Sequence, residues 1–225
     1  MNTYLIANGS CGERLASVMT MLYQCGFYGS DNPVKGVLVI DNDTENRAKV
    51  HLKEIVDAVN GMNAAMGSNV PAIEFTHWAP KVGDAQSVNN IITNTPEMEA
   101  LSLIMTSDEL AQTIEGKGYA GHVNIGMTLV NTTLETDSHE KSSKAEFEEF
   151  LSKACQKQGG ERARFIIIGS THGGTGASLN TAIATKLRSY YKGSSAKIEV
   201  IGLFMMSYYS IPPMKNPARL SLKSF

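Results

Sequence analysis

Short apolar runs alternate with longer stretches of helical periodicity along most of this chain of 225 residues. Apolar runs at 4–7, 36–41, 164–170 and 197–206 predict strands, and amphipathic stretches follow the first three. Parallel strands buried on both faces are almost continuously apolar, and crossover helices cover them. The alternation therefore predicts an α/β fold, a three-layer Rossmann-like domain with a mostly parallel sheet and helices on both faces.

The expected helices carry their apolar residues on one face. The face after the first strand comprises Leu15, Val18, Met19 and Leu22. The face after the second strand comprises Ala48, Leu52, Ile55, Val56, Val59, Met62 and Met66. A short possible strand lies at 72–78, and further helices are expected at 107–116 and 143–157. Ser143 and Glu146 have the spacing of a capping box.

Composition limits the compartment and the partners. The net charge of −2 gives no electrostatic footprint for nucleic acid or for an anionic membrane. Cys11, Cys25 and Cys155 have unrelated spacings, so neither a disulfide framework nor a zinc site is expected. No apolar run reaches the roughly 18 residues of a membrane span, and the first residues do not form a signal peptide. We expect a cytoplasmic protein with one domain at 1–206, followed at 207–225 by a tail or the truncated start of a further segment.

Two strand-to-helix junctions carry glycine turns, 8-NGSCGER-14 and 170-STHGGTGAS-178. Glycine lets a ligand approach the backbone and adopts positive φ, so that successive N–H groups can converge. The N–H groups and the positive dipole end of a helix that begins there favour phosphate. Both turns are expected at the edge of the sheet where ligands bind in parallel α/β folds. For 9-GSCG-12 alone, plain connection chemistry is an equal alternative.

Two weaker features lie elsewhere along the chain. Asp41 and Asp43 follow the second strand, where carboxylates can hold Mg²⁺ through water. Alternatively, Asp43 or Thr44 caps the next helix. The segment 118–126 has glycines at both ends and Gly121 between them, which suggests a loop that wraps a ligand. The sequence has neither a Walker A loop nor a G-x-G-x-x-G motif, which disfavours P-loop ATPases and the usual dinucleotide fingerprint.

In order and spacing, these features resemble the nucleotide-binding domain of the tubulin/FtsZ superfamily over about residues 4–206. The turn 9-GSCG-12 has the tubulin form. The segment 172-HGGTGAS-178 keeps the centre of the family's G-G-G-T-G-[ST]-G loop, and 118–126 is similar to its γ-phosphate loop. The resemblance implies a divergent bacterial tubulin-like protein that binds GTP or GDP.

The resemblance also implies the ligand contacts. Mg²⁺ is expected near Asp41 and Asp43. The implied nucleotide site comprises Gly9, Ser10, Cys11, Gly12, Gly121, His122, Asn124, Gly126, Thr171, His172, Gly173, Gly174, Thr175 and Gly176. In such a family the protein is a GTPase that assembles into a homo-oligomer or filament, and a neighbouring subunit supplies acidic residues that complete hydrolysis.

The sequence departs from the family pattern at several positions. His172, Ala177 and Ser178 differ from the family loop. Glu13 and Arg14 stand where the family usually has amide residues, which leaves the choice of base open. One alternative is a Rossmann-like dinucleotide-dependent enzyme in which Asp41 holds a ribose. Another is a nucleotide-binding scaffold without turnover.

Overall fold

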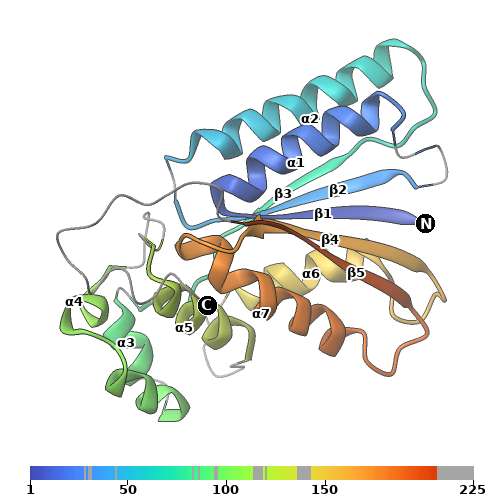
Figure 1. The fold of residues 1–225 in the computed structure, drawn as a ribbon. Helices are drawn as coiled ribbons and strands as arrows, with labels where there is room; N and C mark the ends of the chain where they lie inside the picture. Colours follow the sequence, from blue (N-terminus) through green and yellow to red (C-terminus); the bar gives the residue numbers. More distant parts are fainter. Residues whose placement is uncertain are drawn as a thin grey trace.

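Within the residues that the structure describes, five strands form one parallel sheet in the order β3-β2-β1-β4-β5 (Figure 1). The strands are β1 (Asn2–Asn8), β2 (Val34–Ile40), β3 (Glu74–Trp78), β4 (Arg162–Ser170) and β5 (Lys197–Met205). The computed structural model describes residues 1–27, 29, 32–43, 45–82, 84–85, 87–93, 96–113, 119, 121–135 and 143–206. The segment 207–225, expected as a tail, therefore lies outside the described residues.

Helices cover both faces of the sheet, which confirms the three-layer prediction (Figure 1). One face is covered by α1 (Gly9–Gln24) and α2 (Arg47–Ala65), and the other by α6 (Lys144–Ala154) and α7 (Gly174–Tyr190), with α5 (Val123–Glu135) beside α7. Three short elements complete the described chain: α3 (Val88–Thr93), the 3₁₀ helix η1 (Pro96–Leu103) and α4 (Ser107–Leu110). None of the helices within the described ranges is long and apolar enough to cross a membrane.

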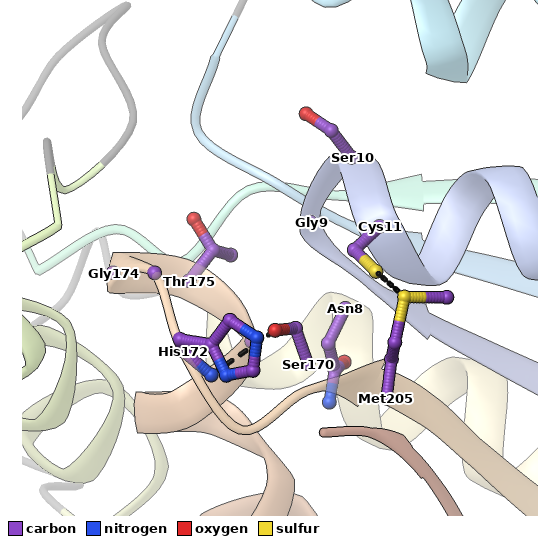
Figure 2. A pocket seen from close by; sticks show the side chains of 11 residues that line it. Asn8, Gly9, Ser10, Cys11, Ser170, His172, Gly174, Thr175 and Met205 are labelled. Carbon is purple, nitrogen blue, oxygen red and sulfur yellow. Dashed lines mark hydrogen bonds between the residues drawn. The ribbon is translucent and has the colours of Figure 1, made fainter. Parts of the chain in front are cut away.

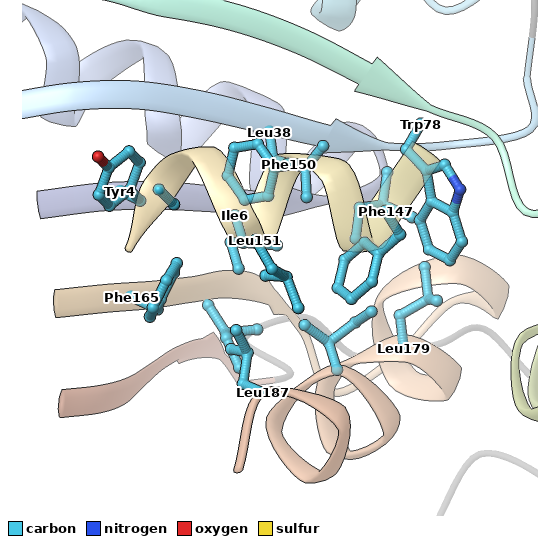
Figure 3. Packing of buried hydrophobic residues seen from close by; sticks show 14 of the residues in the cluster. Tyr4, Ile6, Leu38, Trp78, Phe147, Phe150, Leu151, Phe165, Leu179 and Leu187 are labelled. Atoms are coloured by element: carbon cyan, nitrogen blue, oxygen red, sulfur yellow. The ribbon is translucent and has the colours of Figure 1, made fainter. Parts of the chain in front are cut away.

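The period of two along each strand divides the core into two layers. Leu5 and Ala7 of β1 belong to the cluster under α1 and α2, whereas Ile6 belongs to the cluster under α6 and α7. Figure 3 shows Phe147 and Leu151 of α6 between this helix and α7, in the cluster that covers this face of the sheet. Both faces are thus apolar, as the continuous apolar runs predict.

The predicted apolar face of α1 is wrong at Val18, whose exposed fraction is 47%. The buried positions of this helix are mainly small residues, among them Gly12, Ala16 and Ser17. A methyl group added at Gly12 would lie 2.4 Å from the carbonyl oxygen of Ile168. Because α1 lies so close to the sheet, its inner face has room only for small side chains, and larger apolar residues occupy its flanks. The predicted apolar face of α2 is also only partly buried.

In α2, Leu52, Val56 and Val59 are buried as predicted, but Met62 and Met66 are exposed. The apolar stripe therefore ends before the helix does.

The capping box predicted at Ser143 is absent from the described residues. The side chain of Ser143 makes no cap hydrogen bond; its hydroxyl donates to the carbonyl oxygen of Ala79 and accepts from the N–H group of Lys81. Ser143 therefore fixes the chain beyond β3 against the start of α6. A capping box does occur at α4, where Thr106 and Glu109 bond reciprocally, although this helix spans four residues rather than the predicted 107–116.

Candidate functional site

A pocket of about 340 Å³ lies at the carboxyl ends of β1, β4 and β5 (Figure 2). The edge of a parallel sheet where the strand order reverses is the usual ligand site of such folds. The lining residues are Asn8, Gly9, Ser10, Cys11, Ser170, His172, Gly173, Gly174, Thr175, Gly176 and Met205. Most of the two predicted glycine turns is thus brought together in one cavity.

Two helices begin at this pocket, and their first turns are open. α1 begins at Gly9 and α7 at Gly174, so the second glycine turn is itself the first turn of a helix. Among the described residues, neither Asn8 nor Gly173, which precede the two helices, makes a side-chain cap hydrogen bond. Gly173 has φ 89° and ψ 170°, a conformation available essentially to glycine alone. Both helices therefore present N–H groups that no capping side chain occupies.

The two turns contact each other directly. A methyl group added at Gly9, which has φ 66°, would lie 2.9 Å from the Cβ atom of Thr175. A methyl group at Gly176 would lie 2.8 Å from the backbone nitrogen of Ser170. Glycine at these positions lets the N-termini of α1 and α7 approach each other and the sheet edge. Their positive dipole ends therefore act on the same small volume.

An amide network forms the floor of the pocket. The amide group of Asn8 donates to Oδ1 of Asn180 at 2.9 Å, and the amide group of Asn180 donates to the carbonyl oxygen of Ser170 at 3.1 Å. All three residues are buried. The network ties the end of β1 to the end of β4 and to α7, so that the two glycine turns are held in a fixed relation.

Sulfur atoms and a hydroxyl close the side of the pocket near β5. The thiol of Cys11 donates to Sδ of Met205 at 3.5 Å, and the N–H group of His172 donates to the hydroxyl of Ser170 (Figure 2). Thr171 is not a lining residue; its hydroxyl donates to the carbonyl oxygen of Met205. Burial raises the pKa of the Cys11 thiol, which keeps it protonated at neutral pH.

A buried tyrosine joins the pocket to the end of β2. Tyr119 is buried, and its hydroxyl donates to Oδ1 of Asn42 at 2.7 Å. A methyl group added at Gly174 would lie 2.6 Å from the Cβ atom of Tyr119 and 3.1 Å from the backbone nitrogen of Gly121. The turn around Gly121 thus lies against the first turn of α7, although Gly121 does not line the pocket. Gly118 and Ala120 of the predicted loop lie outside the described residues.

The other predicted ligand residues have different surroundings. Gly12 packs against the sheet, and a methyl group at Gly126 would lie 2.2 Å from the hydroxyl of Ser178, so both glycines allow helices to pack closely. Asn124 lines a separate groove between α5 and α7, and His122 contacts Glu109. These four residues do not line the pocket at the glycine turns.

The junction between β2 and α2 is closed by its own side chains. The amide group of Asn46 donates to Oε2 of Glu13 at 2.6 Å and to Oδ2 of Asp41 at 2.7 Å. Its carbonyl oxygen accepts from the N–H group of Ala48 and caps α2. The expected cap, Asp43 or Thr44, is therefore wrong at Asp43, whose Oδ1 accepts from the N–H group of Glu45; Thr44 lies outside the described residues.

Burial raises the pKa of both carboxyl groups in this cluster. Burial and, next, the charge of Asp41 raise the pKa of Glu13 to about 8. Burial also raises the pKa of Asp41, although hydrogen bonds from Asp43 and Asn46 oppose the change. Among the described residues, Oε1 of Glu13 has no hydrogen-bond partner. Glu13 is therefore mostly neutral at pH 7, which limits its repulsion of Asp41.

The predicted magnesium ligands do not form a ready cation site. Oδ1 of Asp41 accepts from the N–H group of Asp43, and Oδ2 accepts from Asn46. The described part of the chain contains no group of three His, Cys, Asp or Glu residues that could hold a metal ion. As they lie, Asp41 and Asp43 do not fit a resident Mg²⁺.

No protein-family model, no curated protein and no solved structure matches the chain. The assignment of the site therefore depends on its geometry and on the sequence motifs.

Met205 is the lining residue that sequence reasoning missed, and Asn8 and Ser170 belong to the predicted glycine turns but were not among the implied ligand contacts. All three stand at the last residue of a strand, β5, β1 and β4 respectively, which was a usable signal. The capping box of Thr106 and Glu109 was also missed, although the two residues have its spacing.

Proposed function

We propose that the chain binds a nucleotide through its phosphates, in the pocket between the first turns of α1 and α7. The observation that carries the proposal is the convergence of two helix N-termini without side-chain caps on one cavity. Such termini supply N–H donors and a positive dipole end, the two features that favour phosphate. Among the described lining residues there is no Lys or Arg, so the backbone would hold the anion.

The choice of GTP follows from the resemblance to the tubulin/FtsZ superfamily. The turns that carry this resemblance, 9-GSCG-12 and 173-GGTG-176, are the ones that line the pocket together. We therefore propose a cytoplasmic GTP-binding protein that assembles with copies of itself and hydrolyses GTP. A nucleotide-binding scaffold without turnover would use the same pocket. Filament pelleting with and without GTP, together with a phosphate-release assay, distinguishes such a scaffold from an active GTPase.

The dinucleotide-dependent enzyme is the less favoured candidate. In that reading Asp41 holds a ribose, but its exposed fraction is 2% and both of its carboxyl oxygens accept hydrogen bonds from within the protein. A ribose would need one of these oxygens to be released. The strand order and the pocket position are shared with dinucleotide folds and do not distinguish the two functions.

The direct experiment measures nucleotide binding by a matched pair of variants. Gly173 and Gly193 both have positive φ, 89° and 77°, and an added methyl group at either would meet no atom within 4 Å. Gly173→Ala strains the turn at the pocket, whereas Gly193→Ala strains a turn after α7. We expect Gly173→Ala to weaken GTP binding at least about tenfold, which is about 1.4 kcal/mol, and Gly193→Ala to bind like the wild type.

The affinities of the wild type and the two glycine variants are measured by equilibrium binding of labelled GTP, GDP and ATP to the purified chain. Binding of GTP and GDP in preference to ATP supports the proposal. Equal failure to bind all three nucleotides contradicts it, and so does equal weakening by the two glycine variants. Analysis of the nucleotide released when the purified protein is denatured identifies the base independently.

A further inference from the structure

The floor of the pocket contains a hydrogen-bond acceptor that the protein itself leaves unused. Asn8 lines the pocket, is 1% exposed and directly precedes Gly9, the first residue of α1. Among the described residues, no group donates a hydrogen bond to its Oδ1. Figure 2 shows the side chain of Asn8 between those of Ser170 and Met205, which also line the pocket. Buried polar atoms almost always have a partner, so an unused acceptor in the wall of a pocket points to a ligand.

The hydrogen bonds of the floor determine which atom of the Asn8 amide is unused. The carbonyl oxygen of Ser170 can only accept, so Asn180 presents its NH2 group to it, at 3.1 Å. Asn180 therefore presents Oδ1 to Asn8, and the NH2 group of Asn8 donates to this oxygen at 2.9 Å. If the Asn8 amide turned over, two oxygens would face each other. Oδ1 of Asn8 is thus held in place as the atom without a partner.

Phosphate groups do not supply the missing partner. The oxygens of an ionised phosphate ester are acceptors, which suit the N–H groups at the starts of α1 and α7 but repel another acceptor. The pocket therefore offers several donors and, at its floor, one acceptor. A ligand that satisfies all of these groups carries a hydrogen-bond donor close to its phosphates.

In a nucleotide, the ribose hydroxyls are the donors closest to the phosphates along the covalent chain, and the N–H groups of the base lie beyond the sugar. The pocket has a volume of about 340 Å³, near the lower end for ligand sites. A nucleotide whose phosphates lie at the two helix starts therefore has its sugar as the next group along.

We propose that Oδ1 of Asn8 accepts a hydrogen bond from a ribose hydroxyl of the bound nucleotide. The proposal rests on the proposed function and makes Asn8 a specificity-determining residue. It predicts that the pocket prefers ribonucleotides to their deoxy forms, because a deoxy sugar leaves the buried acceptor without a donor.

The first experiment uses the wild type alone. Its affinities for GTP, 2′-deoxyGTP, 3′-deoxyGTP and 2′,3′-dideoxyGTP are compared by equilibrium binding. We expect the dideoxy analogue to bind at least about tenfold more weakly than GTP. One of the two single-deoxy analogues should show most of this loss, which identifies the hydroxyl. Inosine triphosphate lacks the exocyclic amino group of guanine but keeps both hydroxyls, so it reports on the base separately.

The second experiment removes the acceptor. Asn8→Leu keeps the approximate size of the side chain, and Asn63→Leu is the matched control. Asn63 is a buried asparagine of α2 whose Oδ1 accepts from Gln24, and it does not line the pocket. We expect Asn8→Leu to bind GTP and dideoxyGTP within about twofold of each other, whereas Asn63→Leu keeps the wild-type ratio. Loss of the bond to Asn180 would weaken both nucleotides alike, so the ratio reports recognition rather than a disturbed floor.

Equal affinity of the wild type for GTP and dideoxyGTP overturns the proposal, even if Asn8→Leu does not fold, and leaves the binding function standing. A wild-type ratio in Asn8→Leu also overturns it, as does loss of the ratio in Asn63→Leu. An acceptor that reads the base instead would show itself if Asn8→Leu abolished a preference for GTP over inosine triphosphate, and this result would contradict the ribose contact. A wild type that binds no nucleotide contradicts the binding function itself.

Discussion

The junctions β4–α7 and β2–α2 stand at the same edge of the sheet, yet they treat the start of a helix in opposite ways. At β4–α7, Gly173 precedes the helix without a side-chain cap and the first turn faces a cavity. At β2–α2, Asn46 caps the helix and bridges Glu13 and Asp41. The first junction is open to an anion, whereas the second is filled by the protein's own acidic side chains.

The difference shows that a strand-to-helix junction is not a ligand site by position alone. All helices that begin at this edge have positive dipole ends. At α2 the side-chain carbonyl oxygen of Asn46 caps that end, and its NH2 group donates to the carboxyl groups of Glu13 and Asp41, so an approaching phosphate would meet acidic groups. At α1 and α7 the same donors remain for a ligand.

Of the substitutions, Gly12→Ala, which disturbs the close approach of α1 to the sheet, should lower the free energy of unfolding the most. Gly12→Ala places a methyl group 2.4 Å from the carbonyl oxygen of Ile168, a backbone atom that cannot move aside cheaply. We expect a loss of about 3 kcal/mol in the free energy of unfolding, measured by urea titration, as for overpacking in a rigid site.

Gly61→Ala is the control, because Gly61 lies within α2 and an added methyl group there meets no atom within 4 Å. This substitution should stabilise the protein by up to about 1 kcal/mol through helix propensity. Equal stability of the two variants would contradict the assigned role of Gly12 in seating α1 against the sheet.

Removing the Asn46 contacts at the β2–α2 junction should lower the free energy of unfolding less than Gly12→Ala does. Asn46→Ala removes the α2 cap and the two amide hydrogen bonds to Glu13 and Asp41. We expect a loss of about 2 kcal/mol, of which about half is the cap. Asn46→Ser keeps a capping oxygen but lacks the amide group, so it should recover only the cap contribution. If both variants match the wild type in urea unfolding, the cluster does not stabilise the junction.

Much of the open junction could be predicted from the sequence, and little of the closed one. Continuous apolar runs and glycine turns are local signals, and they located four strands, the helices after β1, β2 and β4, and most of the pocket. The contacts of Glu13 with Asn46 and of Asn42 with Tyr119 join residues 33 and 77 positions apart. No local pattern encodes such contacts, and the inner face of α1 was misjudged because its close approach to β4 is also a long-range property.

The protonation of Glu13 should make stability depend on pH. Its pKa of about 8 lies above its ordinary value of 4.5, so the folded state binds this proton more tightly than the unfolded chain. The contribution is complete below about pH 4.5 and is lost as pH rises through about 8. Within this interval stability should fall by about 1 kcal/mol per pH unit.

Glu13→Gln keeps the shape of the side chain and cannot ionise. Its free energy of unfolding, measured between about pH 5 and about pH 9, should lack the decrease due to Glu13. Persistence of the full wild-type slope in Glu13→Gln would show that another group causes it.

The smallest effect is expected at the edge of the open junction. His172→Gly introduces the glycine that the tubulin/FtsZ loop has at this position and removes an imidazole that lines the pocket. Because backbone groups of 173–176 are proposed to hold the phosphates, GTP affinity should change by less than about threefold, under 0.7 kcal/mol. A loss of tenfold or more in a binding titration would mean that the imidazole contacts the ligand.

The contrast between the junctions is tested most directly by backbone amide NMR of the labelled protein during titration with GTP. We predict the largest shifts at Gly9–Cys11 and at Gly173–Gly176, with saturation at one common affinity. The N–H group of Ala48, already bonded to Asn46, should move little. Shifts centred on 41–48, or none at either glycine turn when GTP is bound, would contradict the account.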